Sequence, residues 1–182
     1  MRKTLIMTIT AVAALTAGCS SSAEEGTVAA PSTTAAAPAP SSASAAPTTA
    51  AESLDAAAIL AELQSAGLPI TDSAAVTETN DANNLIGRPG QYVSKTAFAD
   101  SRVGQPIDQA APGNDAGGSI EVFATAADAR TRSDYIQKSL ASLGPVAGTE
   151  YHYLTGTALV RVTGVLPPSA AAEYETAVAA IG

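Results

Sequence analysis

The fold of this chain is decided by residues 117–145, which read GGSIEVFATAADARTRSDYIQKSLASLGP. Behind two glycines, Ser119–Phe123 is short and mostly apolar, with β-branched and aromatic side chains, which predicts a strand. Thr125 and Asp128 form a Thr-x-x-Asp capping box, a pattern typical of the first turn of a helix. A final Gly-Pro pair ends that helix. A strand that leads directly into a long helix predicts a domain in which helices pack on a sheet.

The predicted helix carries one apolar stripe, which we expect to be buried. The stripe consists of Ala129, Ile136, Leu140 and Leu143. The charged side chains of the same helix fall outside the stripe: Arg130, Arg132, Asp134 and Lys138.

Two strands and a helix are predicted on the C-terminal side of this unit. Residues 151–154 and 158–165 read as strands joined near Thr155-Gly156-Thr157, which predicts a hairpin. A Pro-Pro pair at residues 167–168 then begins a last helix. Its apolar side consists of Ala171, Tyr174, Val178 and Ile181.

A helix and a strand are predicted on the N-terminal side. Ser53 is the expected N-cap of a helix that ends before Gly67. Its buried face holds Ala56, Ile59, Leu60 and Leu63. Residues 68–90 and 104–118 read as loops, because Gly, Pro, Asn and Asp gather in them. Between these loops, residues 91–99 alternate like a strand, with one face formed by Tyr92, Ser94, Thr96 and Phe98.

These elements follow the order α-β-β-α-β-β-α and predict an α+β fold. The expected architecture is a two-layer sandwich in which the helices cover one face of a mostly antiparallel sheet. Residues 52–182 form this domain, and their 131 residues suffice for one core of ordinary size.

The first 19 residues predict export and lipid attachment. Arg2 and Lys3 precede an apolar run, Leu5–Leu15, which is the length of a signal-peptide core and too short for a membrane span. The run ends in Leu-Thr-Ala-Gly-Cys, which resembles the bacterial lipobox. We therefore expect a signal peptide over residues 1–18 and a diacylglyceryl group on Cys19. The alternative is an ordinary secretory signal with an incidental cysteine.

A low-complexity segment separates this signal from the domain. Ala, Ser, Thr and Pro make up 27 of the 31 residues from 20 to 50. Such a segment buries too little apolar surface to offset its ordering entropy, so residues 19–51 are predicted to be a lipid-bearing, disordered tether. A second interpretation is O-glycosylation of threonines in proline-rich stretches: Thr33, Thr34, Thr48 and Thr49.

Composition excludes several classes of function. The chain has 9 basic and 17 acidic residues, a formal charge of −8, which argues against nucleic-acid binding. Removal of residues 1–18 leaves 7 basic residues and a formal charge of −10. One Cys and one His allow neither a disulfide within the chain nor a Cys/His zinc site.

No local motif predicts catalysis. The single histidine, His152, has no recognisable nucleophile beside it in the sequence, and we expect it at a strand surface or edge. The stretch from Gly117 to Glu121 is no nucleophile elbow, because Glu121 stands where the second glycine of Gly-x-Ser-x-Gly belongs. The acidic turns at residues 81–84 and 114–115 do not match an EF-hand, so we expect solvated turns, with calcium binding as the alternative. No cofactor is predicted.

Tyrosines and arginines leave two interpretations open. The tyrosines form either core or a recognition surface, and we expect core: Tyr92, Tyr151, Tyr153 and Tyr174. The arginines bind an anionic ligand or neutralise the acidic excess of the domain: Arg88, Arg102 and Arg161.

Several stretches of the chain resemble segments of a group of small uncharacterised actinobacterial lipoproteins with a lipobox signal peptide. The stretches are residues 87–95 (GRPGQYVSK), 118–123 (GSIEVF), 150–153 (EYHY) and 159–162 (LVRV). The resemblance covers most of residues 55–178 and implies a high-GC Gram-positive source. It carries no known activity and no known site.

The sequence thus predicts a lipid-anchored protein on the extracytoplasmic face of the cell membrane. We expect its domain to be a non-catalytic module that binds an unknown envelope protein or ligand. The expected contact surface is an exposed sheet face together with loops 80–90 and 104–118. The alternative is a small envelope hydrolase whose site is assembled from distant residues around His152 as the base.

Overall fold

The computed structural model describes residues 54–182. The predicted signal peptide (1–18), the lipidation site Cys19, the tether up to residue 51 and the predicted N-cap Ser53 all lie outside the described residues. Within residues 54–182, no helix combines the length and the apolar character needed to cross a membrane.

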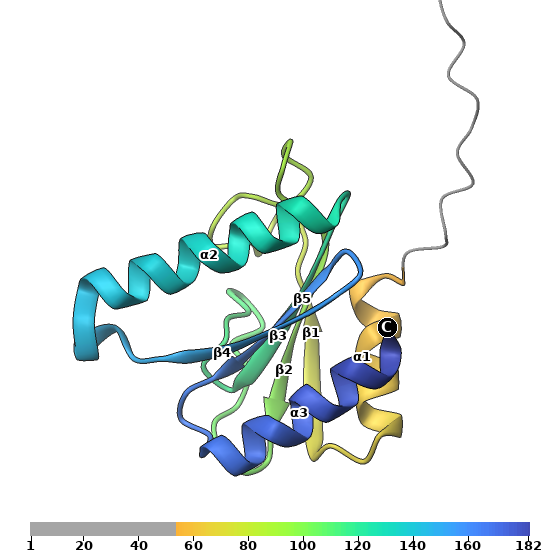
Figure 1. The fold of residues 1–182 in the computed structure, drawn as a ribbon, viewed down its shortest axis with the longest axis vertical. Helices are drawn as coiled ribbons and strands as arrows, with labels where there is room; N and C mark the ends of the chain where they lie inside the picture. Colours follow the sequence, from red (N-terminus) through yellow and green to blue (C-terminus); the bar gives the residue numbers. More distant parts are fainter. Residues whose placement is uncertain (1–53) are drawn as a thin grey trace, which may run out of the picture. The chain divides into compact units, whose positions relative to one another are not determined.

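The described residues form three α-helices and a five-stranded antiparallel sheet of strand order β1-β2-β3-β5-β4 (Figure 1). The predicted α+β class is therefore confirmed. In chain order the elements are α1 (Ala56–Ser65), β1 (Ile70–Ala75), β2 (Tyr92–Asp100), β3 (Gly117–Phe123), α2 (Ala126–Leu143), the short 3₁₀ helix η1 (Gly144–Ala147), β4 (Glu150–Thr155), β5 (Ala158–Thr163) and α3 (Pro168–Ile181).

Strand β1 lies in a segment that the sequence predicts to be a loop. Its sequence, ITDSAA, has little β-propensity, and Ala74 is its only buried residue. β1 is an edge strand that pairs with β2 alone. The segment forms a strand because it pairs with β2. The local sequence pattern does not predict this pairing.

Helices pack on both faces of the sheet, so the expected two-layer arrangement is wrong. Figure 1 shows α2 on one side of the sheet and α1 with α3 on the other. Side chains of β3 alternate accordingly: Ile120 and Val122 join the core under α1 and α3, whereas Phe123 packs with Ala129 of α2. Strands β2, β3 and β5 are buried along almost their whole length, so the sheet face that we expected to be exposed is covered.

A β-bulge at the start of β2 places Tyr92 and Ser94 on opposite faces. Tyr92 pairs with Phe123 and Ser94 pairs with Val122, which leaves Val93 as the extra residue, 55% exposed. The Ser94 hydroxyl accepts a hydrogen bond from the backbone N–H of Ala56, at the start of α1. The prediction that Tyr92 and Ser94 share a face is therefore wrong, because the extra residue of the bulge shifts the alternation of side chains between the two faces of the sheet.

The helix boundaries mostly follow the predictions. Thr125 caps α2 as expected, and the 155–157 hairpin and α3 are both present. Asp55, two residues after the predicted cap, accepts from the N–H of Ala58 and begins α1. The predicted stripe of α2 is wrong at Leu143, which is 67% exposed, because the helix there runs into η1, where no residue is buried.

Candidate functional site

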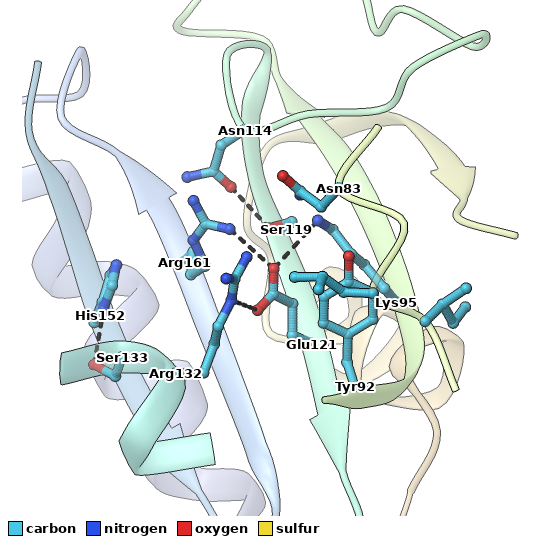
Figure 2. Close-up of polar contacts among 12 residues, drawn as sticks. Asn83, Tyr92, Lys95, Asn114, Ser119, Glu121, Arg132, Ser133, His152 and Arg161 are labelled. Atoms are coloured by element: carbon cyan, nitrogen blue, oxygen red, sulfur yellow. Dashed lines mark hydrogen bonds and ion pairs between the residues drawn. The ribbon is translucent and has the colours of Figure 1, made fainter. Parts of the chain in front are cut away.

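A buried carboxylate lies at the centre of the sheet, on the face covered by α2. Glu121 has no exposed surface, and three cations meet it (Figure 2). Lys95 Nζ lies 3.2 Å and Arg161 Nη1 2.9 Å from its Oε1. Arg132 Nε lies 3.2 Å from its Oε2. We call Glu121, its three cations and Glu150 the Glu121 cluster.

Strand register and one helix bring the Glu121 cluster together. Lys95 of β2 stands directly opposite Glu121 of β3, and Arg161 of β5 stands opposite the neighbouring Ser119. Opposite charges facing each other across strands are favourable. Arg132 reaches the same carboxylate from α2, which lies over this face. Two neighbouring strands and the covering helix thus each contribute one cation to Glu121.

The cations keep Glu121 ionised. Burial by itself raises the pKa of a carboxyl group, because it disfavours the charged form. The charges of Arg161, Lys95 and Arg132 outweigh this effect and hold the pKa of Glu121 below its usual value. The cluster is therefore a set of paired charges at neutral pH.

Glu150 extends the cluster toward the edge of the sheet. Arg161 grips it with two parallel hydrogen bonds, Nε to Oε2 and Nη2 to Oε1, each 2.8 Å long. Burial would raise the pKa of Glu150, but hydrogen bonds from His152 and Arg161 and the charge of Arg161 lower it to about 2. All three nitrogens of the Arg161 guanidinium therefore donate within the cluster.

The structure brings a serine and a glutamate to His152. Ser133 Oγ lies 2.8 Å from His152 Nδ1, and Glu150 Oε2 lies 3.1 Å from His152 Nε2. His152 lies on edge strand β4, as expected, but its side chain is only 5% exposed under α2 rather than at a surface. These are the residue types of a hydrolase triad, and no local motif signalled them.

The arrangement of Ser133, His152 and Glu150 differs from that of a working triad. In a triad the serine faces Nε2 and the acid holds Nδ1, whereas here the two partners are exchanged. Ser133 is 8% exposed in the middle of α2, where backbone N–H groups bond within the helix and cannot form an oxyanion hole. Neither Ser133 nor His152 is among the residues that line four of the pockets on residues 54–182.

A pocket of about 380 Å³ opens between α2 and the loop before β2. We call it the Arg132 pocket, because Arg132 connects it to the Glu121 cluster. Its lining combines amides, a hydroxyl, a guanidinium and apolar side chains: Asn83, Leu85, Gly90, Gln91, Thr131, Arg132 and Tyr135.

Asp81 holds the loop side of this pocket in place. It is 5% exposed and accepts hydrogen bonds from the backbone N–H groups of Asn83, Leu85 and Ile86. The Tyr92 hydroxyl donates to the same carboxylate at 2.8 Å. Burial would raise the pKa of Asp81, but these hydrogen bonds lower it. The turn is thus organised from inside by a buried carboxylate, so the expected solvated turn is wrong at Asp81.

The other predicted positions divide between core and ion pairs. Tyr92 and Tyr174 are fully buried, and the partly buried Tyr151 and Tyr153 pack against the core, so the core interpretation is confirmed. Arg102 pairs with Asp100 and Glu173, and Arg161 belongs to the Glu121 cluster. Both arginines therefore neutralise acidic residues, whereas Arg88 is exposed.

Sequence reasoning missed Lys95 and Arg132 as site residues. One signal was available, since Glu121 interrupts an otherwise apolar strand and a buried carboxylate requires partners. Which cations pair with this carboxylate depends on the strand order and on the side of the sheet that α2 covers. Among residues 54–182, no group of three or more His, Cys, Asp or Glu side chains is placed to hold a metal ion.

Comparison with protein-family models, curated proteins and solved structures found no match to the chain.

Proposed function

We propose that the chain is a lipid-anchored extracytoplasmic protein whose folded domain is a non-catalytic binding module. The export and lipidation half of this proposal is supported by the basic start, the apolar run and the lipobox-like sequence ending at Cys19. The binding half is carried by one observation, the Arg132 pocket.

The Arg132 pocket has the attributes of a small-molecule site. Its volume of about 380 Å³ lies in the range of ligand pockets, roughly 300–1,000 Å³. One wall is the helix α2, and the other is the loop that Asp81 fixes through three backbone N–H groups. Polar and apolar groups both line it, which allows a ligand to be oriented as well as buried.

A fragment screen tests the pocket as the binding element. The full chain in nonionic detergent is exposed to small acidic, basic and neutral compounds, and binding is followed by saturation-transfer NMR. Thr131→Trp fills the pocket and should abolish the binding of most hits. Thr176→Trp is the matched control, because both threonines are exposed helical residues whose hydroxyls donate to the carbonyl four residues earlier, each at 2.9 Å.

Two results would contradict the binding proposal. One is the absence of any compound that binds the unaltered chain. The other is a set of hits that Thr131→Trp and Thr176→Trp bind equally well, which would place binding elsewhere on the domain.

A hydrolase remains the second candidate, because Ser133, His152 and Glu150 are hydrogen-bonded in series. A panel of fluorogenic esters tests it on the full chain. Ser133→Ala should leave any ester turnover unchanged, as should Ser139→Ala, a serine on the same helix that donates to the Tyr135 carbonyl. Turnover that Ser133→Ala alone abolishes, with unchanged stability, would establish the hydrolase and overturn the non-catalytic module.

A further inference from the structure

We propose that the Arg132 pocket recognises a monoanionic carboxylate attached to a small apolar body. This inference rests on the proposed binding function and adds the chemical class of the ligand. It follows from three properties of the site: the hydrogen bonds that Arg132 makes, the charge balance around it, and the lining of the pocket.

Arg132 has donors to spare, whereas every nitrogen of the Arg161 guanidinium donates to a carboxylate. Its Nε donates to Glu121 Oε2 at 3.2 Å, and its Cζ lies 5.9 Å from the centroid of the Tyr92 ring, so the guanidinium is held from two sides. Its two Nη atoms have no hydrogen-bond partner among residues 54–182, although the side chain is only 11% exposed and lines the pocket. Arg161, by contrast, donates from Nε, Nη1 and Nη2 to two carboxylates.

The two Nη atoms form a planar pair of donors. A carboxylate matches this geometry with two parallel hydrogen bonds, and such charge-assisted pairs are stronger than neutral ones. Because Glu121 already holds Nε, the guanidinium is oriented before any ligand arrives. A preoriented donor loses less freedom on binding.

Within the Glu121 cluster, the cations outnumber the carboxylates by one. The cluster holds three cations, Lys95, Arg132 and Arg161, against two carboxylates, Glu121 and Glu150. This surplus of one positive charge occurs in a domain with 7 basic and 14 acidic residues between positions 54 and 182. The carboxylates of Asp81, behind the loop wall, and of Asp128, beside Gly90 in the lining, also lie close to the pocket. They would repel a dianionic phosphate more strongly than a monoanion, so a single negative charge suits the site.

The rest of the lining suits an organic acid. Asn83 and Gln91 add carboxamide groups that hydrogen-bond to oxygen ligands. Leu85 and the 64% exposed ring of Tyr135 supply apolar surface for the body of the ligand. The pocket therefore joins one charged end to an apolar side.

Benzoate, benzamide and phenyl phosphate test this assignment on the full chain in nonionic detergent. They share one ring and differ in charge, and equilibrium dialysis gives the dissociation constant of each. We expect benzoate to bind at least ten times more tightly than benzamide and more tightly than phenyl phosphate. Arg132→Gln should weaken benzoate binding about tenfold or more, because it removes the charged donor pair.

Two further variants separate recognition from folding. Arg132→Lys keeps the charge beside Glu121 but loses the planar pair, so the fold should persist while benzoate binding weakens. Arg130→Gln is the matched control: Arg130 is an exposed arginine on the same helix that does not line the pocket, and benzoate affinity should not change.

The carboxylate assignment is overturned if benzamide or phenyl phosphate binds as tightly as benzoate. It is also overturned if Arg132→Lys binds benzoate as the unaltered chain does. In these cases the binding module itself survives, provided that the fragment screen yields hits that Thr131→Trp removes. A screen without such hits contradicts both proposals.

Discussion

At the scale of single residues, Glu121 supplies the negative charge that pairs with three cations in the middle of the sheet. It accepts contacts from Lys95, Arg132 and Arg161 while having no exposed surface. A buried ion cluster adds little stability over an apolar core, but removing one member leaves unpaired charges in a buried site. The cluster therefore makes the domain sensitive to substitution at this position.

Glu121→Gln should lower the free energy of unfolding by about 3–5 kcal/mol, because three cations then face one another with no central carboxylate. Urea denaturation of the full chain in detergent measures the change. Glu173→Gln is the control, since its carboxylate pairs with Arg102 but is 56% exposed, and it should cost no more than about 1 kcal/mol. Equal effects of the two substitutions would refute the central role of Glu121.

Glu150 makes the stability depend on pH. Its pKa is lowered from 4.5 to about 2 in the folded chain, so its contribution is complete above about pH 4.5. The contribution is lost as the pH falls from about 4.5 to about 2, where the folded carboxylate also takes up a proton. Glu150→Gln should therefore flatten the fall in unfolding free energy across this window, measured by urea denaturation at several pH values.

The control for this pH dependence is Glu62→Gln, at an exposed residue of α1 that forms no ion pair within residues 54–182. Its stability should fall with pH as steeply as that of the unaltered chain. A Glu150→Gln curve parallel to both would show that Glu150 is not the source of the acid sensitivity.

At the scale of elements, β3 is the strand that both layers of helices share. Gly117 and Gly118 begin it, and neither has a positive φ, so the glycines are required by space rather than by backbone conformation. A Cβ on Gly118 would meet the carbonyl oxygen of Arg161 and the ring of Phe98. The smallest residue thus lets β5 and the Phe98 side chain approach β3 closely.

Gly118→Ala should destabilise the domain by about 1–3 kcal/mol, because the added methyl group overpacks a buried strand. Thermal unfolding measures the effect. Gly113→Ala is the control, since a Cβ there meets Asp115 Oδ2 at an ordinary 3.5 Å and should change little. A neutral Gly118→Ala would mean that β3 and β5 separate without cost.

At the scale of the whole molecule, the lipid anchor stays a prediction, whereas the fold of the domain is described. The domain is described from residue 54, whereas Cys19 lies outside the described residues. A diacylglyceryl group inserts two acyl chains, each buried methylene contributing about 0.8 kcal/mol, so lipidation alone would hold the protein at a membrane.

Cys19→Ala should abolish incorporation of labelled fatty acid and remove the protein from the membrane fraction. Metabolic labelling followed by fractionation measures both. Ser20→Ala, which alters the neighbouring residue and keeps the thiol, should behave as the unaltered chain does. A Cys19→Ala protein that still incorporates labelled fatty acid would disprove the lipobox interpretation.

Local patterns in the sequence determined most of the elements. The capping box at Thr125, the Gly-Pro stop after α2 and the hairpin near Gly156 all occur where the sequence predicts them. Each depends on contacts within a few residues, such as the Thr125 hydroxyl accepting from the N–H of Asp128 at 3.1 Å. Interactions between residues only a few positions apart can be predicted from the local sequence.

Only the tertiary structure decided what lies on each face and which residues form the site. Strand β1 depends on pairing with β2, and Tyr92 changes face through a bulge. Arg132 falls outside the apolar stripe of α2, yet it turns inward because Glu121, 11 residues earlier, is buried beneath the helix. Burial, strand order and helix placement join residues that are distant in the chain, so no local pattern contains the Glu121 cluster or the pocket beside it.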